Sequence, residues 1–472
     1  MDKRPVLIWF RRDLRLADHP ALTAASASGR PVIPVFLCDE TVETLGAAPK
    51  WRLGLGVAAL AEALTLQGSR LILRRGRAQA TLDALIAETG AGAVFWTRYY
   101  EPAHIARDRA IKAALTATGI EARSYPGALL AEPGQVVTGA GRPYAVFTPF
   151  WRALRARDVG QTLPTPAQLS PPPAWPLSET MADWGFDRAM GPGARVVRPH
   201  LQVGAAAAGA RLAAFLGDRL ARYAADRDTP AADAGSGLSE NLAWGEISPR
   251  QVWCAAERVR DRLGAPVDKF LSELGWREFA WHLMFAHPAM ATACWRPEWE
   301  RFAWRPNNDD AEAWRRGMTG VPMVDAGLRE MFVTGRMHNR VRMIAASYLT
   351  KHLLTDWRVG LGWFQECLID WDPAANALGW QWVAGCGPDA APFFRIFNPD
   401  LQAARHDPDG RYRARFLAEG PARPDTDALA FFNAAPKAWA LSFDQPYPAP
   451  RIGTADGRHR ALAALARLRT DP

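Results

Sequence analysis

The sequence predicts an α/β domain with a parallel sheet, then a connector, then a large all-α domain. The first third of the 472 residues alternates short apolar runs with helical patterns, which is typical of βαβ units. A proline-rich stretch follows, and after Leu201 the strand patterns stop while helical patterns continue. We therefore place the α/β domain at residues 1–131, the connector at 132–200 and the helical domain at 201–472.

The first domain is expected to be Rossmann-like, with each apolar run forming a buried strand. The expected strands are Val6–Phe10, Val32–Cys38, Leu71–Leu73 and Ala93–Thr97, and the expected helices are Trp51–Gln67, Gln79–Thr89 and Ala103–Thr118. The turn after the first strand carries Arg11-Arg12-Asp13-Leu14-Arg15 in place of a G-x-G-x-x-G fingerprint. The sequence therefore does not predict the usual dinucleotide site at this turn.

The connector is expected to be extended rather than helical, because it holds many prolines between Gln161 and Pro176 and then Gly191-Pro192-Gly193. The helical domain continues to about Arg451 without internal repeats. Its expected helices are Ala205–Ala225, Ser248–Arg262, Val267–Ala286, Val324–Thr334, Asn339–Thr355 and Leu361–Leu368.

The composition is that of a globular protein, with 49% apolar and 22% charged residues. A net charge of +8 and a pI near 9.5 suit a polyanionic partner such as nucleic acid. However, 51 of the 57 basic residues are Arg and the chain is rich in Ala, as a GC-rich genome produces. The charge alone therefore makes nucleic acid one candidate partner and no more.

The cysteine pattern argues against a disulfide framework and against a structural zinc site, so we expect no bound metal. The cysteines are odd in number and form no CxxC pair: Cys38, Cys254, Cys294, Cys367 and Cys386. The first apolar run has five residues, which is too short for a signal peptide, and no apolar stretch approaches membrane-spanning length. We expect a cytoplasmic protein without a membrane segment.

The most informative segment is a polar-aromatic block between Met337 and Pro399. It holds Met-His-Asn-Arg, Asp-Trp-Asp-Pro-Ala-Ala-Asn, Gly-Trp-Gln-Trp and Phe-Arg-Ile-Phe-Asn-Pro in that order. Polar groups placed among buried aromatic rings need partners, so the pattern indicates a site for something large, flat and polar-edged. A planar cofactor and a stacked base are the two candidates.

A second candidate binding segment is the loop at residues 233–239, which reads Asp-Ala-Gly-Ser-Gly-Leu-Ser and follows Tyr223 and Arg227. Small residues with hydroxyls and free N–H groups before a helix suit a pyrophosphate. A flexible loop with Ser239 as a plain N-cap explains the same residues, and the loop alone favours this second interpretation.

Two helical segments each place polar and apolar groups on one face. Glu273, Trp276 and Arg277 share a face at spacings suited to a base that is stacked and hydrogen-bonded at its edge. An amphipathic helix with a border ion pair is the alternative. Asn339 and Met343 also share a face and could line an adaptable pocket, although a core Met is the commoner outcome.

Asp372-Pro373 is typical of an N-cap followed by Pro at the first helical position, which places Asn376 in the first turn. Arg342 is the natural partner of Asp370, because an unpaired carboxylate among aromatic rings is costly. Three further indoles share no helical period and so come from different elements: Trp304, Trp357 and Trp380. They either fill the core or, if they lie in series, carry an electron inwards.

Taken together, the ordered motifs closely resemble the DNA photolyase/cryptochrome family, specifically the bacterial class I cyclobutane pyrimidine dimer photolyases. The resemblance runs from about Val6 to Ile452. It rests on residues 11–15, Gly-Glu-Ile-Ser-Pro-Arg at 245–250, Trp-Arg-Glu-Phe at 276–279, Thr-Gly-Val-Pro-Met-Val-Asp at 319–325, residues 337–342 and residues 394–399.

The resemblance implies an N-terminal domain for an antenna pigment and a helical domain that binds a U-shaped FAD. The matching FAD positions are Tyr223, Gly235, Ser236, Gly237, Leu238 and Ser239 near the phosphates, Arg342, Asp370 and Asp372 near the isoalloxazine edge and ribityl chain, and Asn376 facing flavin N5. Trp380, Trp357 and Trp304 match the family's photoreduction chain from proximal to distal.

The implied function is that of a deoxyribodipyrimidine photolyase, in which light-driven electron transfer from reduced FAD splits cyclobutane pyrimidine dimers in UV-damaged DNA. The dimer would be flipped out of the duplex and stacked against indoles. The matching catalytic positions are Glu273, Trp276, Asn339, Met343 and Trp382, and the matching DNA-binding positions are Arg227, Arg277, Arg340 and Gln402. A monomer is expected.

Two departures from the family pattern bear on the cofactors. Gly235 and Gly237 replace the usual Thr and Arg of the phosphate loop, so a hydroxyl and a cation are lost and FAD affinity is the property affected. Ala103 and His104 stand where folate-binding relatives carry Asn and Glu. These two residues therefore do not single out a folate. The second chromophore is expected to be methenyltetrahydrofolate or 8-hydroxy-deazaflavin, and a flavin or an empty cleft also remain open.

Three other functions compete with dimer repair. A cryptochrome-type blue-light photoreceptor has the same fold and FAD, but the five catalytic matches and the lack of a long C-terminal extension favour repair. Repair of the (6-4) lesion in relatives uses a His pair, whereas this chain has Met337-His338-Asn339-Arg340. A light-independent nucleic-acid-binding protein would bind no flavin at all.

Overall fold

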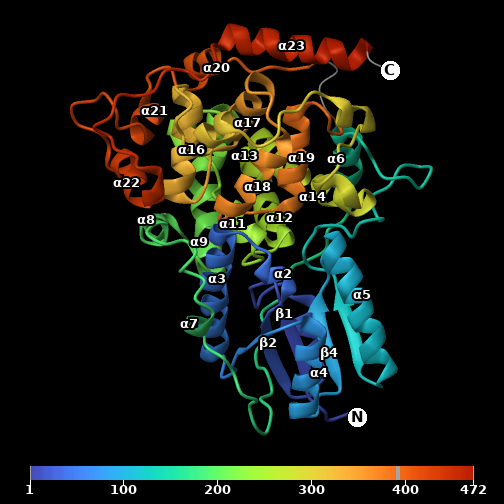
Figure 1. Ribbon diagram of the computed structural model, residues 1–472. Coiled ribbons are helices and arrows are strands. Elements are labelled where there is room, and N and C mark those ends of the chain that lie inside the picture. The colour runs from blue at the N-terminus through green and yellow to red at the C-terminus, as the bar shows by residue number, and fades with distance from the viewer. Residues whose placement is uncertain (1, 390–393, 471–472) are drawn as a thin grey trace.

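The N-terminal part of the protein is a five-stranded parallel sheet with helices on both faces (Figure 1). The computed structural model describes residues 2–389 and 394–470. The strand order is β3-β2-β1-β4-β5, and β1 lies at the centre, pairing Val6 with Val32 on one side and with Ala93 on the other. The strands are β1 (Val6–Phe10), β2 (Val32–Cys38), β3 (Ile72–Arg75), β4 (Ala93–Thr97) and β5 (Glu121–Tyr125).

The two faces of the sheet are covered by different helices, which is why the central strands are apolar throughout. On one face, Ile8 and Phe10 pack with α1 and α3; on the other, Leu7 and Trp9 pack with α4 and α5. The helices of this domain are α1 (Pro20–Ala27), α2 (Glu40–Glu43), α3 (Ala47–Leu66), α4 (Ala78–Thr89) and α5 (Pro102–Ala117).

The predicted α/β fold with a parallel sheet is confirmed, and three of its strands have the predicted bounds. The third strand lies one to two residues later than expected. Neither β5 nor α1 was predicted. The sequence of β5 is Glu-Ala-Arg-Ser-Tyr, in which only Ala122 is buried, because β5 is an edge strand. Such a strand has no apolar run by which to find it.

The connector contains helices, so the expectation of an extended segment was wrong for part of its length. The proline-rich stretch is free of helix, but α6 (Phe147–Arg155), α7 (Met181–Trp184) and α8 (Gly193–Val197) lie on either side of it. In α6, Phe147, Phe150 and Leu154 form an apolar face that packs on α14 (Ala265–Ala286). The boundaries at residues 131 and 200 stay predictions.

The second domain is all-helical, as predicted, and Figure 1 shows it stacked above the sheet with α23 lying across its far end. Helices α14, α17 (Asn339–Ser347), α18 (Trp357–Cys367) and α19 (Pro373–Ala384) contribute residues to the site described below, and α16 (Pro322–Thr334) packs on α17. The others are α9 (Ala205–Ala214), α10 (Tyr223–Asp226), α11 (Ser239–Ala243), α12 (Pro249–Glu257), α13 (Arg260–Leu263), α15 (Asp309–Arg315), α20 (Pro399–His406), α21 (Arg411–Phe416), α22 (Thr426–Ala434) and α23 (Thr454–Thr470).

Three predicted helices of this domain are interrupted. The one expected at 205–225 is a regular α-helix only to Ala214, where α9 ends, and α10 begins at Tyr223. The expected helix at 248–262 divides into α12 and α13, and the one at 339–355 is regular only to Ser347.

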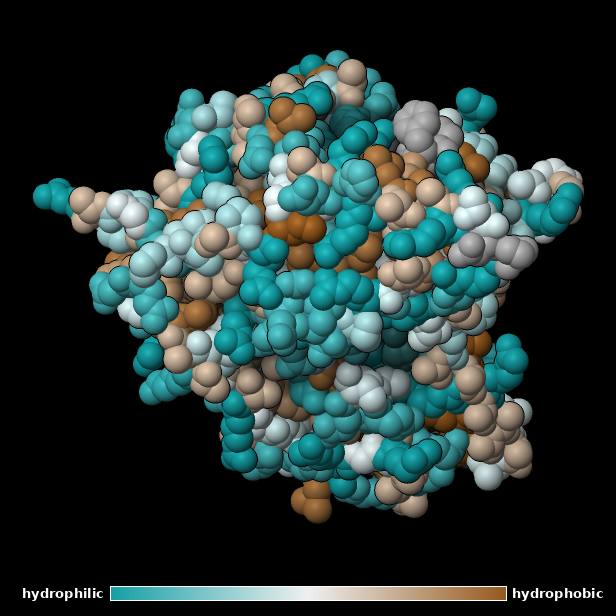
Figure 2. Space-filling view, turned by 45° about the horizontal axis from the view of Figure 1, so that its top comes forward, coloured by the Kyte–Doolittle hydropathy of each residue, from teal (hydrophilic) through white to brown (hydrophobic). Residues whose placement is uncertain are grey.

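The face of the molecule in Figure 2 is mostly hydrophilic, with hydrophobic residues in small separate groups. In the described part of the chain, no helix has both the length and the apolar character that a membrane crossing requires.

A buried carboxyl group joins the end of the predicted first domain to α14. Glu278 Oε2 accepts hydrogen bonds from the backbone N–H groups of Leu130 (2.8 Å) and Ala131 (3.4 Å), while Oε1 has no hydrogen-bond partner. Burial raises the pKa of Glu278 from its ordinary 4.5 to about 8, although the neighbouring Arg277 acts in the opposite direction. The folded protein therefore holds this group protonated at neutral pH.

We expect Glu278 to make the folded protein less stable as the pH rises. Its folded-state pKa is raised, so its contribution to the free energy of unfolding is complete below about pH 4.5 and is lost as the pH rises to about 8. The slope is at most about 1.4 kcal/mol per pH unit. Glu278→Gln keeps the size and an acceptor oxygen but has no charge. Urea unfolding at about pH 6 and about pH 8 should give a smaller pH dependence for this variant; an unchanged slope contradicts the prediction.

Candidate functional site

Two adjoining cavities lie among α10, α11, α14, α17 and α19, and most of the predicted cofactor residues line them. The larger cavity, of about 240 Å³, meets the smaller one, of about 160 Å³, at Arg342, Ala375 and Asn376. The predicted cofactor residues on the larger cavity are Tyr223, Ser236, Leu238, Ser239, Arg342, Asp370, Asp372 and Asn376. Neither Gly235 nor Gly237 is among the residues that line it.

The predicted pair of Arg342 and Asp370 is present at the junction of the two cavities. Arg342 Nη2 donates to both carboxylate oxygens of Asp370, at 3.0 and 2.8 Å, and its Nε donates to the carbonyl oxygen of Met337 at 2.8 Å. Asp370 is 6% exposed, so the pairing offsets the cost of burying its charge. The arginine thus holds a carboxylate at a fixed place on the cavity wall.

Asp372 caps α19, as predicted, and also holds two neighbours. Its Oδ1 accepts from the backbone N–H of Ala375 at 2.9 Å, and Pro373 occupies the first helical position. Its Oδ2 accepts from Trp281 Nε1 at 3.0 Å. Asn376 follows in the first turn, where its Nδ2 donates to the carbonyl oxygen of Asp372 at 2.9 Å. This local pattern fixes the amide of Asn376 between the two cavities.

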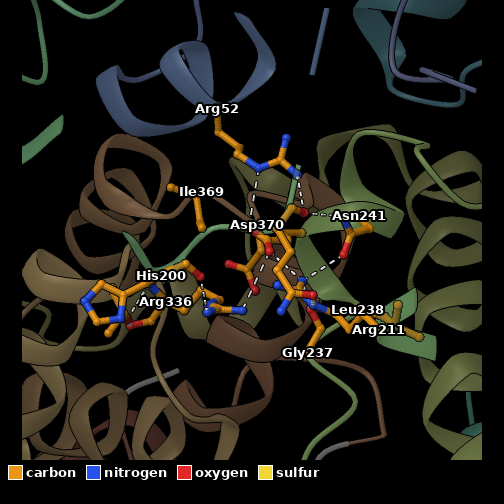
Figure 3. A network of polar contacts seen from close by, with 12 residues as sticks. Arg52, His200, Arg211, Gly237, Leu238, Asn241, Arg336, Ile369 and Asp370 are labelled. Carbon is orange, nitrogen blue, oxygen red and sulfur yellow. Dashed lines mark hydrogen bonds and ion pairs between the residues drawn. The ribbon is translucent and has the colours of Figure 1, made fainter. Parts of the chain in front are cut away.

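The loop at residues 233–239 is supported by an arginine that the sequence did not point to. Arg211 Nη1, from α9, donates to the carbonyl oxygen of Gly237 at 2.6 Å and to Asn241 Oδ1 at 2.8 Å, and it pairs with Glu240 at 2.5 Å. Figure 3 shows Arg211 and Arg52 converging on this region from α9 and α3. Arg211 is a single cation in an Ala-rich helix, and nothing local in the sequence identifies its partners.

The predicted substrate-side residues are divided among different surfaces. Glu273 lines the larger cavity, whereas Asn339 and Met343 line the smaller one. Trp276 stacks on Phe147 of α6, with ring centroids 3.8 Å apart, and Trp382 donates from Nε1 to the carbonyl oxygen of Asp389 at 3.1 Å. Neither indole lines the two cavities, so the structure does not bring all five predicted catalytic residues onto one described wall.

Three of the four predicted DNA-binding residues are arginines, and each of them already has an acidic neighbour. Arg227 pairs with Glu273, Arg340 pairs with Asp228 at 2.6 Å, and Arg277 lies 3.4 Å from Asp372. Gln402, on α20, has a side-chain oxygen without a hydrogen-bond partner. These pairings orient the arginines but also reduce the positive charge that they present.

Glu273 is held in its ionised form. Burial alone raises the pKa of its carboxyl group, but the hydrogen bonds and charges of Arg227 and Lys269 outweigh burial, and the pKa is below its ordinary value. Lys269 Nζ donates to Glu273 Oε1 at 2.8 Å. The cavity wall therefore carries an acceptor group whose charge two cations offset.

Comparison with known proteins identifies the family. Residues 6–171 match the DNA photolyase model, and residues 270–467 match the model of the FAD binding domain of DNA photolyase. The deoxyribodipyrimidine photo-lyase of Agrobacterium fabrum is 43% identical to this chain over 98% of both sequences. This chain belongs to the DNA photolyase family. Its helical domain is an FAD-binding domain.

Solved structures agree with the family membership. A class III photolyase from Agrobacterium tumefaciens superposes with a TM-score of 0.91 and is 42% identical, with 99% of this chain and 98% of that chain covered. A cryptochrome from Synechocystis has a TM-score of 0.84 and is 29% identical, with 98% and 100% covered. The photolyase is the more similar of these two structures.

The three indoles predicted to carry electrons lie in different surroundings. Trp380 is 2% exposed and lines the smaller cavity, where Phe364 and Trp314 contact it at 5.0 and 6.0 Å between ring centroids. Trp357 is fully buried at the start of α18. The rings in contact with Trp304 are those of Trp299 and Phe302. Among the described residues, no ring contact directly joins any two of Trp304, Trp357 and Trp380. Their order in a photoreduction chain stays a prediction.

Gly237 is required by the backbone of the phosphate loop. Its φ is +67°, and a Cβ at this position would lie 3.3 Å from Arg211 Cδ. We expect Gly237→Ala to lower the free energy of unfolding by about 1–2 kcal/mol, because an L-residue is strained at this φ. The matched control is Gly235→Ala, whose Cβ would meet nothing closer than 4.0 Å. Unfolding midpoints and the ratio of flavin to protein compare the two; equal losses contradict the prediction.

A third cavity lies at the carboxyl ends of β1 and β2, in the place where ligands bind parallel α/β sheets. It measures about 120 Å³, and its lining includes Arg11, Asp39 and His104 of the first domain and Trp371 of the second. Burial and the neighbouring arginines lower the pKa of His104 well below its ordinary value, so the imidazole is neutral. This cavity is the candidate site for the antenna chromophore, whose identity the lining leaves open.

Proposed function

We propose that this protein is a deoxyribodipyrimidine photolyase, which splits cyclobutane pyrimidine dimers in UV-damaged DNA with an electron from reduced FAD. One observation supports dimer repair in addition to membership of the family. Glu273 lies on the same cavity wall as the cofactor residues Asp370, Asp372 and Asn376, and the adjoining cavity holds Asn339 and Met343. A flavin and an extruded dimer that occupied these cavities would be in contact.

When bound and excited by light, the reduced flavin supplies the electron that opens the cyclobutane ring, and the electron returns afterwards. The protein supplies the geometry. The ionised Glu273 accepts hydrogen bonds from a base edge, and Arg227 and Lys269 limit the repulsion between this carboxylate and transient negative charge on the dimer. Arg342 and Asp372, which line the same cavity, are held in place through the pairs described above.

DNA binding would rest on positioning and stacking rather than on sequence reading. Arg340 and Arg277 lie where they can exchange their acidic partners for phosphates, which requires no base contact. Trp276, backed by Phe147, offers a flat surface, and a stacked base is worth about 1–3 kcal/mol. A dimer pairs poorly with the opposite strand, so its extrusion costs less than that of an intact base.

The subclass suggested by the relatives differs from the one expected from the motifs. The motifs resemble class I photolyases, whereas the solved structure at 42% identity is a class III photolyase. We therefore assign this protein to class III in place of class I. Pyrimidine-dimer DNA as the partner, an antenna chromophore between the domains, a monomeric state and a cytoplasmic location belong to the same proposal.

The decisive experiment measures the loss of cyclobutane dimers from a UV-irradiated oligonucleotide under blue light, with chemically reduced protein and a dark control. Light-dependent loss supports repair. Bound FAD without dimer loss favours a cryptochrome-type photoreceptor, and a protein that retains no FAD excludes both. Glu273→Gln should lower the repair yield while leaving the flavin content unchanged, because Glu273 faces the substrate side.

A further inference from the structure

Two of the five cysteines, Cys294 and Cys386, lie against each other in the helical domain. Cys294 is 6% exposed and Cys386 is fully buried. Gln381 ties their segments together: its Nε2 donates to the carbonyl oxygen of Ala293 at 2.9 Å, and Cys386 Sγ lies 3.7 Å from its Oε1. The backbone N–H of Arg296 donates to the carbonyl oxygen of Cys386 at 3.1 Å, so the two cysteine segments run side by side, and the neighbouring Cys386 thiol lowers the pKa of Cys294. Nothing in the sequence pairs them, because they are 92 residues apart and form no CxxC motif.

The thiol pair adjoins an indole of the predicted electron chain. Arg358 Nη2 lies 3.9 Å from Cys294 Sγ, and the same guanidinium lies 4.8 Å from the centroid of the Trp357 ring, so the thiol and the indole share this neighbour. The indole also lowers the pKa of the Cys294 thiol, and among the described residues its Nε1–H has no hydrogen-bond partner. Trp357 is fully buried, so a reductant dissolved in the solvent cannot reach its ring directly. A thiol in contact with an oxidised indole is a natural electron donor to it.

A buried amine completes the cluster. Lys351 Nζ donates to the carbonyl oxygen of Ala384 at 2.5 Å and lies 3.4 Å from the centroid of the Phe394 ring. Its side chain is fully buried and, among the described residues, no carboxylate pairs with it. Burial lowers the pKa of Lys351 well below its ordinary value, while negative charge on Cys386 raises it. The neutral amine is thus placed to take up a proton when Cys386 loses one.

We propose that Cys294 and Cys386 form a redox-active dithiol that reduces the flavin through Trp357 under light. Both S–H bonds break and one S–S bond forms, which releases two electrons and two protons. Oxidised FAD becomes its fully reduced anion by accepting both electrons and one proton, and Lys351 takes the other proton. Light excitation of the oxidised flavin supplies the driving force. This proposal rests on the proposed function, because Trp357 acts in it as a member of the predicted photoreduction chain.

The stoichiometry explains why a pair of thiols is useful at this place. A single thiol would supply one electron and leave a reactive sulfur radical, whereas a dithiol delivers the two electrons that full reduction requires and ends as a stable disulfide. The remaining cysteines do not share this setting. Cys254, for example, contacts the carbonyl oxygen of Gly160 at 3.6 Å on another part of the domain.

The test illuminates the FAD-loaded protein with blue light, anaerobically and without added reductant. Absorbance follows the flavin, an Ellman assay in denaturant counts free thiols, and mass spectrometry of the peptides locates any disulfide. We expect a loss of two thiols for each flavin fully reduced, with the new bond between Cys294 and Cys386. Flavin reduction with all five thiols retained, or a disulfide elsewhere, overturns the proposal.

Variants separate this role from a structural one. Cys294→Ser and Cys386→Ser should each abolish the thiol loss and full photoreduction in the absence of reductant, while added dithiothreitol restores photoreduction. Cys254→Ser should behave as the unchanged protein. Equal photoreduction by all four proteins without reductant contradicts the proposal. Failure of the proposed function would appear differently: chemically reduced protein would repair no dimers, while the light-dependent thiol loss would still be measurable.

Discussion

Arg342→Leu should produce a protein that folds but retains little FAD. The change leaves the Asp370 carboxylate, which is 6% exposed, without the cation that donates to both of its oxygens. Removing one partner of such a pair costs about 2–5 kcal/mol, which corresponds to roughly a 30-fold to 4,000-fold rise in the Kd for FAD. The ratio of flavin to protein absorbance after purification, and a titration of the apoprotein with FAD, measure the effect.

Arg340→Leu is the matched control, because it lies on the same helix but pairs with the partly exposed Asp228 outside the larger cavity. It should keep its flavin and lose affinity for DNA instead. Arg342→Lys keeps the charge but not the two-oxygen geometry, so its FAD affinity should lie between those of the other two proteins. Normal FAD content in Arg342→Leu would show that the pair is not needed for cofactor binding.

The fold could be predicted because its central strands are buried on both faces. A strand such as Val6–Phe10 must then be apolar at every position, and this leaves a short run that is easily found. The edge strand Glu121–Tyr125 has one buried residue, so it gives no such run. Helix α6 was missed for a related reason: it is short and lies in a proline-rich region, and it depends on packing against α14.

The parts of the site that could be predicted follow from local rules. Asp372, Pro373 and Asn376 are fixed by the start of one helix, and Asp370 needed a cation that Arg342 supplies. The reason for glycine in the loop at residues 233–239 was not predicted from the sequence. Gly237 was interpreted as the loss of a cation, whereas its φ of +67° makes glycine the residue that the loop requires.

The contacts that could not be predicted join distant segments. Arg211 reaches the loop from 26 residues away, and the thiols of Cys294 and Cys386 meet only through the packing of α19 against the segment after α14. Periodicity and spacing carry no information on such pairs, because any of the many arginines could serve an acid equally well. The relative positions of Trp304, Trp357 and Trp380 depend on helix packing in the same way.

Arg52→Leu should destabilise the whole protein more than any other single change considered. Arg52 lies on α3 in the first domain and is fully buried, as is its partner Glu246 in the second domain. Its Nη1 and Nη2 donate to the two oxygens of Glu246 at 2.8 and 2.7 Å. Removing it leaves a buried carboxylate to which, among the described side chains, the amide of Asn241 alone still donates, at 2.6 Å.

Breaking a buried pair in this way costs about 3–5 kcal/mol, a large share of the roughly 5–15 kcal/mol that stabilises a typical domain. FAD retention should fall as well, because Asn241 and Glu240 belong to the helix that follows the phosphate loop (Figure 3). Urea unfolding followed by tryptophan fluorescence, together with the flavin ratio, measures both effects. Arg74→Leu, which breaks the exposed pair with Glu88, is the control and should cost at most about 1 kcal/mol.

The double variant Arg52→Leu/Glu246→Leu distinguishes an unpaired charge from lost packing. With both partners apolar, no uncompensated carboxylate remains in the interior, so the double variant should be more stable than Arg52→Leu alone. If the two changes instead add, the cost lies in the volume and shape of the arginine. In that case the contact between α3 and the phosphate-loop helix would depend on packing, and charge would have little part in joining the two domains.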